Sequence, residues 1–123
     1  MALKRLEIID KAGNITAFIE LKLEKEIIGN ETLPKLTVNV NGKKATTTAV
    51  ERFLALLEGA FFGLIGENNE VIETPEGYIV FFRGKDRYGI RVGNKSEREV
   101  VFLRKLAYRE LYHWINMQLI ASF

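Results

Sequence analysis

The sequence has no cysteine, and it is also poor in histidine, proline and glutamine. Without cysteine the chain cannot form a disulfide, a zinc site built on thiolates or a thiolate nucleophile, and it fits a reducing compartment. Its one histidine, His113, excludes a metal site built on several histidines of one chain. No serine or acid is visibly placed to work with His113, so we interpret it as a surface or interface residue. We expect no metal and no cofactor.

A long apolar run is also missing. The most apolar stretch, residues 53–65, is interrupted by Glu58 and two glycines, and it is shorter than the ~20 residues needed to cross a bilayer. The first residues, MALKRLEIID, enter an alternating strand pattern and contain no apolar core of a signal peptide. These features predict a cytoplasmic protein without a membrane partner. Abundant glutamate and lysine beside one glutamine are typical of thermophilic proteins, although the eight asparagines are not.

The first half of the chain shows the alternation of apolar and polar residues that predicts β-strands. Alternation covers residues 6–10 and 15–23, with a short polar turn between them. A third strand over residues 36–40 meets Asn41 and Gly42, the strongest two-residue hairpin signal, and is expected to return as a fourth strand. The first unit is therefore predicted to contain four strands.

A helix is predicted to follow these strands. Thr48 and Glu51 have the spacing of a capping box, and the apolar residues after them recur on one helical face until Gly66. The opposite face carries small residues at intervals of four, which would let another helix approach closely: Ala55, Gly59 and Gly63.

The second half repeats the plan with fewer strands. Three strands are predicted at about residues 70–74, 77–83 and 87–92. Ser96 and Glu99 form a second capping-box pattern, which predicts a helix that continues to about Ala121. The expected fold is one α+β domain over residues 1–123, with the element order ββββα-βββα and units at residues 1–66 and 67–123.

The predicted C-terminal helix has two apolar stripes and therefore needs two surfaces to cover them. At 1.5 Å per residue, ~25 residues would be ~37 Å long, which exceeds the length of strands of this size. A second copy of the chain is the simplest cover, because most soluble oligomers are symmetric homo-oligomers. The predicted interface consists of Ala55, Gly59, Gly63, Tyr108, Trp114, Ile115 and Leu119.

Positive charge is concentrated near the C-terminus, although the net charge is only +2. Residues 77–123 contain nine basic residues against four acidic ones, whereas residues 58–76 contain five glutamates and no basic residue. Such asymmetry favours an anionic partner.

Aromatic and basic residues interleave in the segment GYIVFFRGKDRYGIRVGNK, residues 77–95. Single-stranded nucleic acids are bound by this mixture, because bases stack on exposed rings and cations follow the phosphates. The candidate stacking rings are Tyr78, Phe82 and Tyr88. The candidate phosphate contacts are Arg83, Lys85, Arg87, Arg91 and Lys95. We therefore predict a single-stranded DNA or RNA partner.

The register of this hairpin decides which rings are free, and two registers stay open. A two-residue loop places Phe82 opposite Gly89 and puts Tyr78, Val80, Phe82 and Arg91 on one face. A three-residue loop gathers the larger set Tyr78, Val80, Phe82, Tyr88, Ile90 and Val92 on one face, which is typical of a core. In a core interpretation the rings are buried, and the arginines are solvated or paired with glutamates.

The order of the predicted elements resembles the architecture of the Whirly and PUR-alpha groups of single-stranded nucleic-acid-binding proteins. The resemblance covers most of the chain in topology, but not in sequence signatures, and the second unit has three predicted strands where that plan has four. It implies nucleic-acid binding and assigns no residue roles.

Two other functions compete with nucleic-acid binding. An assembly module would use the helices alone to form a homo-oligomer. A metal-dependent nuclease is suggested by Asp10 and by Glu20-Leu21-Lys22, since such enzymes use carboxylates to bind magnesium. The expected hairpin places the two carboxylates about 16 Å apart, at ~3.3 Å per residue, so they cannot share an ion. We therefore expect a protein that is not an enzyme.

Overall fold

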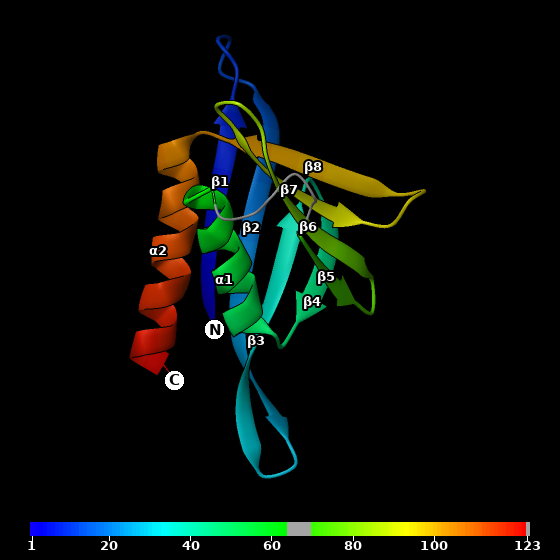
Figure 1. Cartoon of the computed structure of the whole chain (residues 1–123), viewed down its shortest axis with the longest axis vertical. Helices are drawn as coiled ribbons and strands as arrows, with labels where there is room; N and C mark the ends of the chain where they lie inside the picture. Colours follow the sequence, from blue (N-terminus) through cyan, green and yellow to red (C-terminus); the bar gives the residue numbers. More distant parts are fainter. Residues whose placement is uncertain (64–69, 123) are drawn as a thin grey trace.

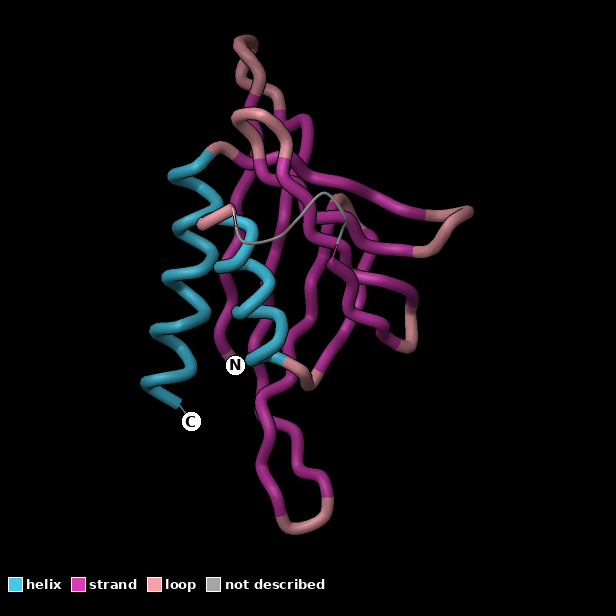
Figure 2. The backbone as a smooth tube through the Cα atoms, in the orientation of Figure 1, coloured by secondary structure: helices cyan, strands magenta, loops and turns pink. Residues whose placement is uncertain are grey.

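The computed structural model describes residues 1–63 and 70–122, which form two four-stranded antiparallel sheets and two helices (Figure 1). The first unit consists of β1 (Ala2–Ile9), β2 (Ile15–Ile28), β3 (Glu31–Val40), β4 (Lys43–Thr47) and α1 (Val50–Phe61). The second consists of β5 (Glu70–Thr74), β6 (Gly77–Arg83), β7 (Tyr88–Gly93), β8 (Arg98–Leu103) and α2 (Lys105–Ser122). Figure 2 shows the two units as strand meanders that each lead into a helix. The predicted α+β class is confirmed.

The first sheet has the order β1-β2-β3-β4 and contains the predicted hairpins. Asn41 (φ 53°) and Gly42 (φ 97°) form the turn between β3 and β4, as this dipeptide indicates. The ribbon of β2 and β3 is longer than predicted, because Ile28 still pairs with Glu31. Its far end projects beyond the rest of the molecule (Figure 1).

The second sheet has the order β5-β6-β7-β8 and contains one strand more than predicted. The pattern of Ser96 and Glu99 does not cap a helix. Instead, the Asn94 side chain accepts hydrogen bonds from the backbone N–H groups of Ser96 and Glu97, at 3.0 and 2.8 Å. These bonds form the turn between β7 and β8, so the predicted helix start is wrong and α2 begins at Lys105 with 18 residues.

The prediction for α1 also needs correction at both ends. Its N-cap residue is Ala49, which makes no side-chain capping bond, while Thr47 Oγ1 accepts from the Ala49 N–H at 3.0 Å. The helix ends at Phe61, and the predicted end at residue 66 lies outside the described residues. Gly63 follows the helix with φ 72°, so it does not continue the small-residue stripe. Within that stripe Ala55 is exposed and Gly59 is half-buried.

The core lies between the inner faces of the two sheets and the two helices. Phe53 of α1 contacts Phe81 of β6 edge to face, with ring centroids 5.0 Å apart. The hydroxyl of Tyr108 in α2 donates to the Leu57 carbonyl at 2.6 Å, and burial raises the pKa of this tyrosine. Tyr108 and Ile115 are both fully buried.

The predicted oligomer interface is therefore wrong at Tyr108 and Ile115, since these side chains are sealed inside one chain. Trp114 and Leu119 are half-buried and pack against the same core. The stripe of α2 that contains Tyr108, Ile115 and Leu119 is therefore covered by the chain's own core, and α2 packs on α1 and β1. Neither described helix has the length and apolar character that a membrane span requires.

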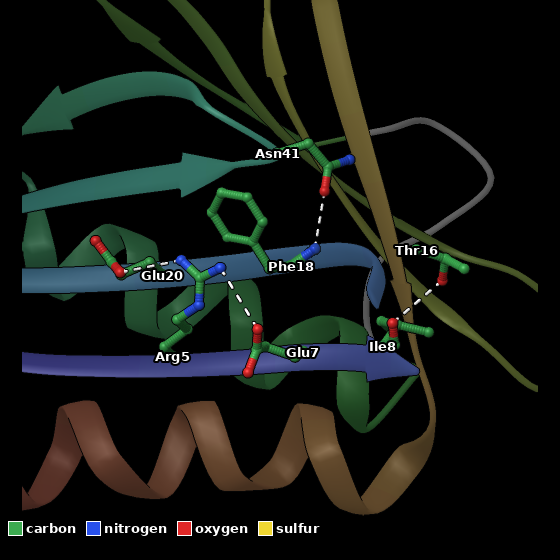
Figure 3. A network of polar contacts seen from close by, with 7 residues as sticks. All are labelled: Arg5, Glu7, Ile8, Thr16, Phe18, Glu20 and Asn41. Atoms are coloured by element: carbon green, nitrogen blue, oxygen red, sulfur yellow. Dashed lines mark hydrogen bonds and ion pairs between the residues drawn. The ribbon is translucent and has the colours of Figure 1, made fainter. Parts of the chain in front are cut away.

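Polar contacts at the hairpin of β3 and β4 join the two sheets. Asn41 Oδ1 accepts from the backbone N–H of Phe18 at 2.8 Å (Figure 3). Its Nδ2 donates to the carbonyl of Val100 at 3.4 Å and to Glu99 at 3.3 Å, both in β8. Close by, Lys43 pairs with Glu97 at 3.1 Å. Asn41 thus extends the pairing of β2 and holds β8 against the first sheet.

Replacing Asn41 tests this bridge. Asn41→Ala leaves the part-buried Phe18 N–H without its acceptor and forces alanine to positive φ, so it is expected to lower the free energy of unfolding by about 1 to 3 kcal/mol. Asn41→Gly removes the hydrogen bonds without the backbone strain and should cost less. Urea unfolding measures both, with exposed Asn14→Ala as the control. Equal stability of Asn41→Ala and the control would contradict a bridging role.

Candidate nucleic-acid interface

The hairpin of β6 and β7 adopts the register of the two-residue loop. Arg83 pairs with Tyr88, and Phe82 pairs with Gly89. The Gly84 N–H donates to the Arg87 carbonyl at 2.8 Å and closes the turn. This pairing excludes the alternative register, in which Tyr78, Phe82 and Tyr88 would have shared one face.

The register divides the predicted binding residues between two sides of the sheet. Tyr78, Phe82 and Arg91 point away from the helices, and Tyr88 points toward them. Tyr88 is only 6% exposed and stacks on Tyr108 with ring centroids 4.5 Å apart. The prediction that Tyr88 stacks on a nucleobase is therefore wrong, because its ring already belongs to the core.

Three of the other predicted cations, Arg83, Lys85 and Arg87, lie around the turn between β6 and β7. Arg83 lies with its guanidinium carbon 5.8 Å from the Tyr88 ring centroid, on the helix side of the sheet. Arg87 stays with its neighbour, since Nη1 donates to the Asp86 carbonyl at 3.1 Å and lies 3.9 Å from the Asp86 carboxylate. Lys85 is exposed at the tip. Arg83 therefore lies on the opposite side of the sheet from Tyr78 and Phe82, whereas Lys85 and Arg87 belong to the turn itself.

Strand β8 contributes two binding candidates that the sequence analysis missed. Phe102 pairs with Gly89, and Arg98 pairs with Gly93, so both share the outer face with Tyr78 and Phe82. They were overlooked because residues 96–121 were expected to be helical. The run Val100-Val101-Phe102 was the available signal, since β-branched and aromatic residues favour strands.

Glycine in β7 leaves room for the aromatic side chains of the outer face. Phe82 leans across β7 so far that a Cβ at Gly89 would overlap its ring. On the far side of that glycine, Phe102 meets Phe82 nearly at a right angle, with an interplanar angle of 82° and centroids 5.6 Å apart. Phe102 is 49% exposed and Tyr78 is 42% exposed. Rings from two strands thus lie across the strand between them.

Two shallow hollows adjoin these rings. One of about 230 Å³ lies beside Tyr78 and Val80, and Arg91, Lys95 and Arg98 line it. Another, of about 320 Å³, is lined by Phe82, Arg91, Arg98 and Phe102, with Val100 and Glu99. Arg91 and Arg98 border both hollows. We call the surface of Tyr78, Phe82, Arg91, Arg98 and Phe102 the ring-and-arginine face.

The charges of the two sheets are partnered differently. On the first sheet, the Arg5 guanidinium lies 3.9 Å above the Phe18 ring and pairs with Glu20 at 3.4 Å (Figure 3). On the second, Arg91 and Arg98 form no ion pair with any described residue. Of the nine basic residues in 77–123, Arg87 alone has a carboxylate partner within the described chain. Arg91 and Arg98 are thus without a carboxylate partner among the described residues and lie beside the partly exposed rings of Tyr78 and Phe102.

The residues considered for a nuclease have other roles. Asp10 accepts hydrogen bonds from the N–H groups of Ala12 and Asn14, each at 2.9 Å, and so forms the turn after β1. Glu20 lies opposite Arg5 in the register of β1 and β2. Across residues 1–63 and 70–122, no three His, Cys, Asp or Glu side chains are grouped as metal ligands. His113 is exposed on α2.

Comparisons of the chain with protein families, with curated proteins and with solved structures found no match. The topological resemblance to the Whirly and PUR-alpha groups therefore stays a prediction.

The contact between Phe82 and Gly89 can be tested by a double-mutant cycle. Gly89→Ala places a methyl group where the Phe82 ring lies, and this overlap should lower the free energy of unfolding by about 1 kcal/mol. In a Phe82→Ala background the same change should be neutral or stabilising, because alanine suits a strand better than glycine. Urea unfolding of the four proteins should give a coupling of about 0.5 to 3 kcal/mol. A coupling near zero would mean that the ring does not cover Gly89.

Proposed function

We propose that the protein binds single-stranded nucleic acid on the ring-and-arginine face, without catalysis. The observation that carries the proposal is that Tyr78 and Phe102 are open to solvent beside Arg91 and Arg98, which have no carboxylate partner in the described chain. Stacking of a base on an exposed ring contributes ~1 to 3 kcal/mol. Guanidinium groups bind phosphate oxygens with paired hydrogen bonds. The face therefore supplies both kinds of contact that a single strand needs.

The rings favour a single strand over a duplex. A duplex hides the faces of its bases in the stack, and it offers phosphates and groove edges instead. Rings that lie across a sheet suit the free faces of unpaired bases. Arg91, Lys95 and Arg98 would contact the phosphates, while Lys85 and Arg87 at the hairpin turn would add longer-range attraction.

Fold analogy gives further support. With β8 the second unit contains four strands, as in the plan of the Whirly and PUR-alpha groups that the element order resembles. The departure in strand number is thereby removed. Because fold alone does not establish function, the proposal depends on the exposed rings and arginines.

The salt dependence of binding tests the proposal. A labelled oligonucleotide of mixed sequence should bind, and fluorescence anisotropy should show its affinity falling with salt. Arg91→Gln with Arg98→Gln should reduce the slope of log K against log salt by about 1.4, at ~0.7 for each phosphate that is no longer neutralised. The matched control is Lys11→Gln with Lys44→Gln, which removes two exposed lysines of the first unit. Absence of binding, or an equal reduction in the control, would overturn the proposal.

A homo-oligomer is the second candidate, and one feature of α2 favours it. Leu106, Met117 and Ile120 are 79%, 49% and 71% exposed. At 100° per residue they lie on one side of the helix, away from the buried Tyr108 and Ile115. Apolar residues in such a row mark a surface suited to a second copy.

Light scattering measures this association directly. If α2 mediates it, the wild type should have the mass of a dimer, and Met117→Lys with Ile120→Lys should have that of a monomer. Ile27→Lys, at the exposed end of the β2 and β3 ribbon, serves as the control and should keep the dimer. A wild-type monomer at high concentration would remove the oligomer altogether.

A further inference from the structure

A groove at the other end of β8 has its own cations and an exposed ring. It lies between the end of α1 and the first half of α2, has a volume of about 380 Å³, and is lined by Glu58, Phe61, Phe62, Lys105, Arg109 and Tyr112. Phe62 is 61% exposed and meets Phe61 edge to face at 5.2 Å. We call this the Phe62 groove.

The cations of the Phe62 groove are not neutralised within the described chain. Lys105 and Arg109 lie four residues apart on α2, a spacing at which like charges repel, and neither forms an ion pair with a residue that the structure describes. Lys105 lies 5.7 Å from the Phe61 ring centroid. Among the described residues that line the groove, Glu58 is the acidic one, and it accepts instead from the Tyr112 hydroxyl at 3.3 Å. Burial, together with the neighbouring charge of Glu58, raises the pKa of Tyr112.

The groove is continuous with the ring-and-arginine face along the chain. Strand β8 carries Arg98 and Phe102 on its outer face and leads through exposed Arg104 into Lys105, the first residue of α2. Arg98 and Arg104 are ~20 Å apart at ~3.3 Å per residue. Exposed Arg104 and Lys105 therefore lie between Phe102 and Arg109 along the chain.

We infer that the Phe62 groove is a second subsite for the same single strand. A base would stack on Phe62, and the phosphates beside it would contact Lys105 and Arg109. Charge complementarity supports this occupant, because Lys105 and Arg109 have no ion-pair partner among the described residues and Glu58 is already hydrogen-bonded. The inference rests on the proposed function, since a strand reaches the groove by way of the ring-and-arginine face.

Oligonucleotide length separates the two sites. Site sizes on single-strand-binding domains range from about 4 to 16 nucleotides, so anisotropy is measured with oligothymidylates at both limits. Lys105→Gln with Arg109→Gln should lower the affinity for the 16-nucleotide strand at least about tenfold through loss of avidity. The same double variant should leave the 4-nucleotide strand unchanged within about twofold. Phe62→Ala should likewise lower the affinity for the 16-nucleotide strand only. Because the ring carries no charge, this loss of affinity should depend less on salt than the loss caused by removing the two cations.

Two comparisons make the outcomes distinct. Arg91→Gln with Arg98→Gln should lower the affinity for both oligonucleotides. The control, Lys11→Gln with Lys44→Gln, should not lower the affinity for one length more than for the other. If the groove variants weaken both lengths equally or neither, the subsite is overturned while binding on the ring-and-arginine face stands. If the wild type binds neither length, the proposed function fails and the subsite with it. All the substituted groove cations are exposed, and circular dichroism verifies that the variants stay folded.

Discussion

The alternation of side chains along β7 is the constraint on which the second sheet depends. Tyr88, Ile90 and Val92 point into the core, where they are nearly or completely buried. Because successive side chains of a strand point to opposite faces, Gly89, Arg91 and Gly93 then point outward. A one-residue shift would place the glycines and the arginine in the core and the apolar residues in water, so the register is strongly determined. The outward residues of this strand offer almost no bulk beyond one guanidinium.

Lack of bulk on the central strand explains the form of the outer face. A ring from β6 leans over Gly89, and a ring from β8 closes on it from the other side. Neighbouring strands lie ~4.8 Å apart, close enough for aromatic side chains to reach across. Apolar rings and cations are therefore juxtaposed in a thin layer on the outer face of the sheet. Such a layer suits the proposed ligand, a single strand, because its bases are flat and its flexible backbone is negatively charged.

The two sheets illustrate how similar residues acquire different roles. Each has an arginine and an aromatic residue on its outer face. Arg5 is held by Glu20 and lies above Phe18, so the contacts of this pair are made within the chain. Arg91 and Arg98 form no ion pair with a described residue, and the rings of Phe82 and Phe102 pack edge to face on each other. The two faces have similar residue types. They differ in whether the arginines are already paired within the described chain, and this difference determines which face we propose as a binding surface.

The sequence by itself determined the α+β class, the two meanders, the Asn-Gly turn and the basic excess of the second half, because these follow from local periodicity, turn chemistry and charge. It also identified Tyr78, Phe82 and Arg91 as binding candidates under one of two registers. Only the tertiary structure decided that register, the strand identity of residues 98–103, and the burial of Tyr88, Tyr108 and Ile115. The physical reason is that a capping-box pattern and an apolar stripe are local signals. Long-range packing determines whether the same residues form a strand, line the core or face the solvent.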